Sequence, residues 1–87
     1  MQLARLSAVT LINKDGLHAR PAAEFVNLAS TFSVPITVNG TDASSLLSIM
    51  SLGLARGSSV KLSSTDLSAW PAINALADLL QSGFGED

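Results

Sequence analysis

The chain has 87 residues, of which 47% are hydrophobic, and it carries a net charge of −2 and no cysteine. This length suits one domain, residues 1–87, whose single core leaves little room for a deep catalytic pocket, so function is expected at the surface. The missing cysteines exclude disulfides and cysteine-bound zinc, one histidine provides too few metal ligands, and no basic patch favours nucleic acid.

No segment of the sequence indicates a membrane span or an export signal. Residues 1–11 lack a charged leader followed by an apolar core, and the longest apolar runs are far too short to span a bilayer. We therefore expect a cytoplasmic protein without membrane insertion. We also expect a monomer that binds no metal, no cofactor and no nucleic acid.

The first third of the chain predicts a strand, a turn and a helix. Residues 3–11 are rich in Leu, Ala, Val and Thr and end at the turn cluster 13–16. Helical spacing begins after the segment 18–21, and Pro21 suits the first turn because its missing N–H costs nothing there. The apolar face of this helix consists of Ala22, Phe25, Val26 and Ala29.

A hairpin is predicted next. Apolar and polar residues alternate over 34–38, which indicates a half-buried strand, although Pro35 restricts it to a sheet edge or a strand start. Asn39-Gly40 is a typical hairpin turn, and a short return strand over 41–43 follows it.

A second helix is predicted after the hairpin. Either Ser44 or Ser45 caps a helix over 46–52, and Gly53 and Gly57 bracket its end.

The last third of the chain predicts a strand over 58–63 and a final helix. Ser68 is expected to cap this helix, and residues 83–87 are expected to fray. The apolar stripe of the helix consists of Trp70, Ile73, Leu76, Ala77 and Leu80.

The resulting order is β-α-β-β-α-β-α, with no internal repeat and no linker. Strands that are separated by helices within one small domain indicate a single sheet with the helices packed on one face. We therefore predict an α+β open-faced sandwich, in which a four-stranded antiparallel sheet is covered on one face by three helices and meets solvent on the other.

The segment 15–21 leads from a turn directly into a helix. The first helical turn has unpaired N–H groups and partial positive charge, which suit an anion and phosphate above all. Arg20 adds a guanidinium that matches phosphate oxygens, and His18 supplies a nitrogen nucleophile beside them. From the residues alone, a lone histidine is more often a capping or packing residue and a neighbouring arginine is equally often a solvated charge.

Two motifs resemble one known family. The segment 16–22, Gly-Leu-His-Ala-Arg-Pro-Ala, closely resembles the active-site signature of HPr, the histidine-containing phosphocarrier of the bacterial phosphoenolpyruvate-dependent sugar phosphotransferase system. The segment 45–53 is similar to the second-helix signature of that family, around its regulatory serine. The spacing of the motifs and the order of elements match as well, so the resemblance covers nearly the whole chain.

The resemblance implies a phosphocarrier that is a covalent intermediate and not an enzyme. The histidine matching His18 takes a phosphoryl group on Nδ1 from enzyme I and gives it to the A component of a sugar permease, in sugar uptake. The arginine matching Arg20 steadies the phosphoryl group, helped by backbone N–H groups near Ala19 and Arg20. Lys14 is either a steering charge or a solvated turn residue.

The resemblance also implies a regulatory and a docking role for the second helix. The serine matching Ser45 is phosphorylated by a serine kinase/phosphorylase in many Gram-positive members, and an N-cap role is compatible with this. The chain departs from the family pattern here, because its hairpin is shorter and Ser44 stands where a lysine is frequent. Partner docking is expected at the exposed apolar residues Leu46, Leu47 and Met50.

Three other functions stay open at this point. The first is a regulatory module that acts through Ser45 alone, which the presence of His18 argues against. The second is an enzyme that uses His18 as a general base, with Asp15 as a poor orienting carboxylate. The third is a sister pathway, nitrogen-linked or dihydroxyacetone-linked, which shares the histidine motif.

Overall fold

Four antiparallel strands and three helices make up the protein in its computed structural model, which describes residues 4–85. The elements, in chain order, are β1 (Ala4–Thr10), α1 (Ala19–Ser30), β2 (Thr37–Val38), β3 (Thr41–Asp42), α2 (Leu46–Ser51), β4 (Ser59–Ser64) and α3 (Trp70–Gln81). Two short 3-10 turns, η1 (Leu67–Ala69) and η2 (Gly83–Gly85), flank α3. The predicted order β-α-β-β-α-β-α is confirmed.

The sheet has the strand order β1-β4-β2-β3, with every neighbouring pair antiparallel. Burial alternates along the central strand β4, where Val60 and Leu62 are buried while Ser59 and Lys61 are exposed. This period of two shows that one face of the sheet carries the core and the other meets solvent. The predicted four-stranded open-faced sandwich is therefore confirmed.

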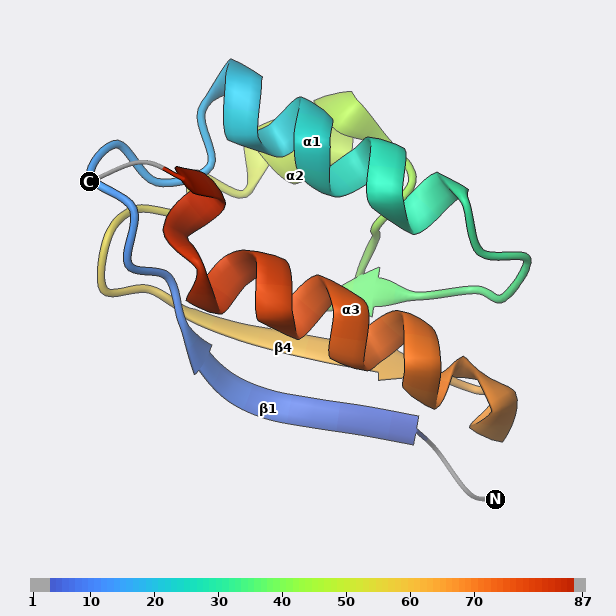
Figure 1. Ribbon diagram of the computed structural model, residues 1–87. Coiled ribbons are helices and arrows are strands. Elements are labelled where there is room, and N and C mark those ends of the chain that lie inside the picture. Colours follow the sequence, from blue (N-terminus) through green and yellow to red (C-terminus); the bar gives the residue numbers. More distant parts are fainter. Residues whose placement is uncertain (1–3, 86–87) are drawn as a thin grey trace.

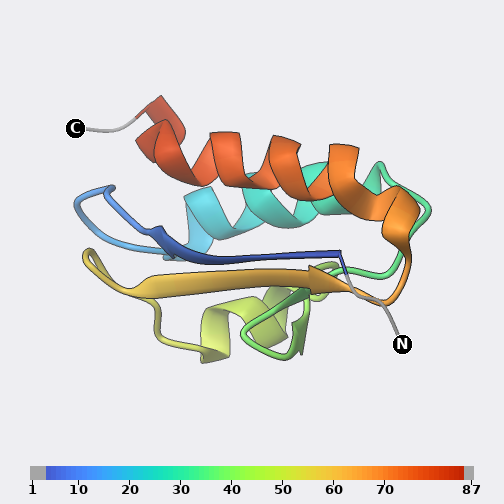
Figure 2. The same cartoon turned by 90° about the horizontal axis from the view of Figure 1, so that it is seen from below.

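The helices supply the other half of the core. In both views α1 and α3 run side by side and antiparallel, with α3 over β1 and β4, and α2 lies next to α1 near β3 (Figures 1 and 2). The predicted stripe of α1 is buried at Ala22, Phe25 and Ala29, and Val26 is half-buried. Each helix therefore buries one face and exposes the other, as its sequence period predicts.

The hairpin turn follows its sequence closely. Both Asn39 (φ 51°) and Gly40 (φ 83°) are left-handed, as a two-residue hairpin turn of the mirror-image type requires. The Asn39 side chain fastens the turn to β4, because its Oδ1 accepts a hydrogen bond from the Lys61 N–H at 2.7 Å. The strand before it is shorter than predicted: β2 contains only Thr37 and Val38, since Pro35 has no N–H to donate to a neighbouring strand.

The start of the last helix differs from the prediction. The carboxylate of Asp66, not the side chain of Ser68, caps this region, accepting hydrogen bonds from the Ser68 N–H at 2.9 Å and the Ser68 hydroxyl at 2.7 Å. These bonds, the hydroxyl first, lower the pKa of Asp66. Trp70 is 40% exposed and does not belong to the buried stripe, which consists of Ala72, Ile73, Leu76, Ala77 and Leu80.

The C-terminal segment differs as well. Residues 83–85 form the ordered turn η2, and the Phe84 side chain is buried at 9% exposure, so the predicted fraying is wrong for this part. Residues 86–87, like Leu3 at the start of the predicted first strand, lie outside the described residues.

Candidate functional site

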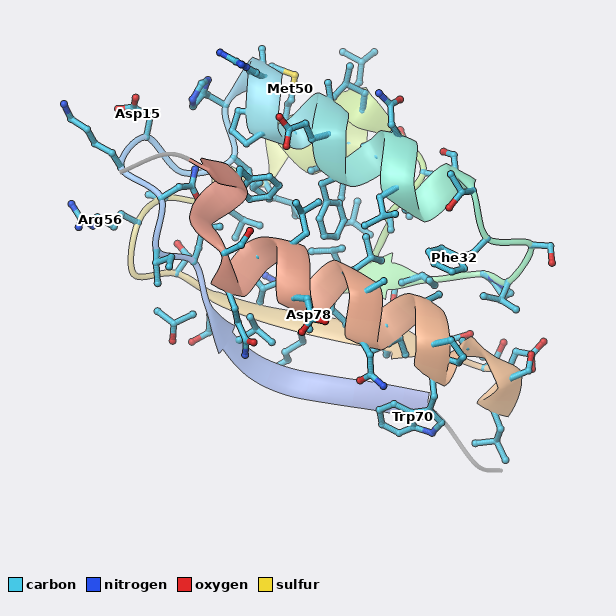
Figure 3. All side chains as sticks on the ribbon, in the orientation of Figure 1. Asp15, Phe32, Met50, Arg56, Trp70 and Asp78 are labelled. Carbon is cyan, nitrogen blue, oxygen red and sulfur yellow. The ribbon has the colours of Figure 1, made fainter. Side chains whose placement is uncertain are left out.

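The turn before α1 is closed by both main chain and side chain. The Gly16 N–H donates to the Asn13 carbonyl at 3.1 Å, and the Asn13 side-chain amide donates to the Gly16 carbonyl. Gly16 has φ 66°, a left-handed conformation that glycine adopts without steric cost. Lys14 and Asp15 occupy the exposed tip of this turn, and Asp15 is labelled in Figure 3.

A second loop holds the turn from the other side. The Leu17 N–H donates to the Leu54 carbonyl at 3.0 Å, and the Leu17 side chain is buried at 4% exposure. The backbone at Gly16 lies so close to this loop that a Cβ atom would be only 2.7 Å from Ala55 Cα. The backbone that leads into His18 is therefore fixed by contacts with a distant segment of the chain.

His18 is the N-cap residue of α1, and its side chain is exposed. Its backbone is extended (φ −78°, ψ −173°), and its carbonyl accepts the N–H of Ala22 at 2.9 Å. Since Pro21 has no N–H, the groups of the first turn that helical geometry leaves for an outside acceptor are the N–H groups of Ala19 and Arg20. They are the two backbone groups at which the family resemblance implies a phosphate contact.

Arg20 lies in the same first turn, and its side chain is exposed. A helix start that combines two N–H donors, a guanidinium and an imidazole favours an anionic group, because the helix dipole and the guanidinium have the same sign. The predicted residues His18, Ala19 and Arg20 are thus brought together by one helix start. Within residues 4–85, no cluster of three or more His, Cys, Asp or Glu side chains is arranged to hold a metal ion.

The predicted exposure of the apolar residues on α2 is confirmed. Leu47 is 82% exposed, Leu46 38% and Met50 39%, whereas Ile49 is fully buried and anchors the helix. Because α2 packs against α1, Met50 lies beside the first turns of α1 in Figure 3. We call the three exposed residues the α2 patch.

Ser45 caps α2, as one of the two predicted alternatives. Its Oγ accepts the Ser48 N–H at 3.4 Å and donates to the Ser48 hydroxyl at 2.9 Å. Ser44 instead bonds to Asp42 Oδ1 through both its N–H and its hydroxyl, at 2.9 and 2.7 Å. The Ser45 side chain is half-buried at the start of the helix that carries the α2 patch.

Sequence reasoning missed the residues that support the site. Asn13 is fully buried, and the Leu54 carbonyl and Ala55 backbone contact the turn from a loop far along the chain. In a sequence, an asparagine within a turn cluster is interpreted as a solvated turn residue. No local sequence signal indicates that Leu17 contacts Leu54.

Other proteins share this chain's sequence and fold. The family model described as "PTS HPr component phosphorylation site" matches residues 7–82. Phosphocarrier protein HPr of Haloferax volcanii is 36% identical over 80 residues, covering 85% of this chain and 90% of that protein. Phosphocarrier protein HPr of Cupriavidus necator is 40% identical over 81 residues, covering 88% and 91%. The crystal structure of HPr-C-His from Thermoanaerobacter tengcongensis has a TM-score of 0.84 and 45% identity, covering 100% and 99%.

The fold and the helix start with its histidine define a small phosphocarrier protein. The chain belongs to the HPr family, the phosphocarriers of the phosphoenolpyruvate-dependent phosphotransferase system. None of the helices within the described residues has the length and apolar character that a bilayer crossing requires.

Proposed function

We propose that His18 accepts a phosphoryl group from phosphorylated enzyme I and passes it to the A component of sugar permeases. One observation carries this proposal: an exposed histidine is the N-cap of a 12-residue helix that presents Arg20 in its first turn. The protein is then a covalent intermediate of the relay, and its partners determine which sugar is taken up.

The chemistry is a displacement at phosphorus. A lone pair on an imidazole nitrogen of His18, Nδ1 by resemblance to the family, attacks the phosphorus atom. The bond from phosphorus to the donor breaks, and its electron pair leaves with the donor. The transferred oxygens carry the negative charge, which the N–H groups of Ala19 and Arg20 and the Arg20 guanidinium stabilise. In the second step the acceptor attacks and His18 is the leaving group.

The test is an incubation with enzyme I and phosphoenolpyruvate. A phosphohistidine is labile in acid and stable in base, whereas a phosphoserine is stable in acid. We expect one acid-labile phosphate per chain, and transfer of that phosphate to a permease A component. A chain that stays unphosphorylated beside a phosphorylated enzyme I would contradict the proposal.

Arg20→Ala is expected to slow phosphoryl transfer without abolishing it. The guanidinium stabilises charge and forms no covalent bond, and loss of one such donor raises a barrier by on the order of 2–4 kcal/mol. Arg20→Lys is expected to restore only part of the rate, because lysine lacks the planar fork. The measurement is the rate of phosphorylation by enzyme I.

Lys61→Ala is the matched control for Arg20→Ala. It also removes one exposed positive charge, but from β4 on the solvent face of the sheet. If both variants lose the same fraction of the rate, general electrostatic attraction explains the loss and Arg20 does not contact the phosphoryl group.

The α2 patch is the proposed docking surface for both partners. Its three residues, Leu46, Leu47 and Met50, are exposed on a helix that packs against α1, the helix that begins after His18. A carrier must leave each partner quickly, and a small apolar surface gives a weak complex of this kind.

Regulation through Ser45 is proposed on the same helix. Ser45→Asp, which imitates a phosphoserine, is expected to raise the melting temperature slightly, because a negative charge at the N-cap stabilises a helix by some tenths to about 1 kcal/mol. It is expected to slow transfer from enzyme I, since the charge lies next to the α2 patch and resists burial against an apolar partner. The melting temperature and the transfer rate are measured on the same sample.

Ser51→Asp is the control for the helix-dipole effect. It places the same charge at the other end of α2, where it is expected to lower the melting temperature. If Ser45→Asp lowers stability and leaves transfer unchanged, a regulatory role for Ser45 is wrong.

A further inference from the structure

The support of the candidate site contains a buried amide with no assigned role. Among the side chains whose burial the structure describes, Asn13 and Ser64 are the buried polar ones, and Asn13 is completely buried. A polar group in such a position is costly unless hydrogen bonds satisfy it. Its amide donates to the Gly16 carbonyl, two residues before His18.

The Asn13 amide is one of two contacts that hold the backbone directly before His18. Gly16 is fixed on one side by Asn13, and on the other by the loop whose Leu54 carbonyl accepts the Leu17 N–H at 3.0 Å. Since Leu17 is buried as well, the backbone that enters His18 has contacts on both sides. The closed 13–16 turn therefore lies directly before the backbone from which the His18 side chain extends.

The C-terminal turn η2 covers Asn13. Gly83 lies over Ile12 and Asn13, since a Cβ atom at Gly83 would be 3.5 Å from Ile12 Cγ1 and 4.0 Å from Asn13 Cβ. All three residues of η2 are left-handed, including Phe84 at φ 59°. This conformation is unfavourable for phenylalanine and persists because the ring is buried in the core. In Figure 1 the red η2 turn thus lies beside the blue turn that leads to His18.

We propose that Asn13 is a positioning residue for phosphoryl transfer, which holds the turn 13–16 closed and so fixes His18 against the donors of α1. This inference rests on the proposed function of His18. Transfer to a nucleophile depends steeply on its position, and a displacement of about 1 Å costs on the order of a hundredfold in rate. An open turn would leave His18 exposed and intact but wrongly oriented.

The test uses Asn13→Leu, which keeps the number and branching of the side-chain heavy atoms but removes the amide donor, together with Asn13→Ala. Ser64→Ala is the matched control, since it removes the other buried polar side chain, whose hydroxyl accepts the Asp66 N–H at 3.1 Å after β4. All variants are measured at a temperature where circular dichroism shows them folded. We expect the rate of phosphorylation by enzyme I to fall on the order of tenfold or more in both Asn13 variants and to stay within about twofold in Ser64→Ala.

A second readout separates positioning from general stability and does not need a partner. Imidazole resonances of His18 are recorded by NMR on the unphosphorylated protein at one fixed pH. We expect shifted His18 resonances and faster amide exchange of Leu17 in both Asn13 variants, and neither change in Ser64→Ala.

The outcomes are distinct. A wild-type chain that enzyme I cannot phosphorylate overturns the proposed function of His18, while the His18 resonances still test the link from Asn13 to His18. Unchanged His18 resonances and an unchanged rate in folded Asn13 variants overturn the inference. If both Asn13 variants are unfolded, or if Ser64→Ala lowers the rate equally, Asn13 serves stability alone and the inference is wrong.

Discussion

His18→Ala is expected to abolish acceptance of phosphate and to leave the fold intact. The side chain is exposed, and it begins α1 with an extended backbone that any residue adopts. No other imidazole and no thiol can take over the nucleophilic role, because the sequence contains one histidine and no cysteine. The expected result is no acid-labile phosphate after incubation with enzyme I and phosphoenolpyruvate, together with an unchanged circular dichroism spectrum.

Asn27→Ala provides the control for His18→Ala. Asn27 is another exposed polar residue of the same helix, and its replacement is expected to leave phosphate uptake unchanged. Acid-labile phosphate on the His18→Ala protein would show that another group accepts the phosphoryl group. Unfolding of that variant would show instead that the side chain is structural.

The groups that would bind and accept phosphate could be predicted because they are neighbours in the sequence. His18, Ala19 and Arg20 are consecutive at one helix start, so their proximity requires only the local rule that places N–H donors at the first turn. The hairpin was predictable for a similar reason, since Asn39-Gly40 adopts the left-handed turn without help from the rest of the chain.

The support of the site could not be predicted, because it depends on contacts between distant segments. Gly83 of η2 packs against Ile12 and Asn13, and the Leu17 N–H donates to the carbonyl of Leu54, far along the chain. The sequence pattern also gave no reason to expect an ordered Phe84, since glycines on both sides of it are typical of a fraying end.

The errors at the start of α3 have a local cause. Asp66 and Ser68 are both good capping residues two positions apart. Because the η1 turn precedes α3, the chain begins to coil at Leu67, and the Asp66 carboxylate acts as the cap by accepting the Ser68 N–H. The same turn moves Trp70 to the first position of α3, at the end of the core, where it remains 40% exposed. A helical period predicts which residues lie on the apolar face of a helix, but not the position along the helix at which that face is no longer buried.

Gly16→Ala is expected to destabilise the protein strongly and to displace the turn that leads to His18. An alanine must adopt φ 66°, which costs about 1–2 kcal/mol. Its Cβ would also lie 2.7 Å from Ala55 Cα and closer still to the Leu54 carbonyl oxygen, and such overpacking against backbone costs about 1–3 kcal/mol more. Relief of the contact would break the hydrogen bond from the Leu17 N–H to Leu54. The rate of phosphoryl transfer should therefore fall even in the fraction that remains folded.

Gly53→Ala separates the two costs. Gly53 is left-handed to the same degree, at φ 63°, but a Cβ atom there would meet nothing within 4 Å. This variant is expected to lose only the conformational part of the stability, about 1–2 kcal/mol in urea unfolding, and to transfer phosphate at nearly the wild-type rate. Equal losses of stability in Gly16→Ala and Gly53→Ala would mean that the loop at residues 54–55 does not press on the turn. In that case the close packing of the two loops would not be what fixes the backbone at His18.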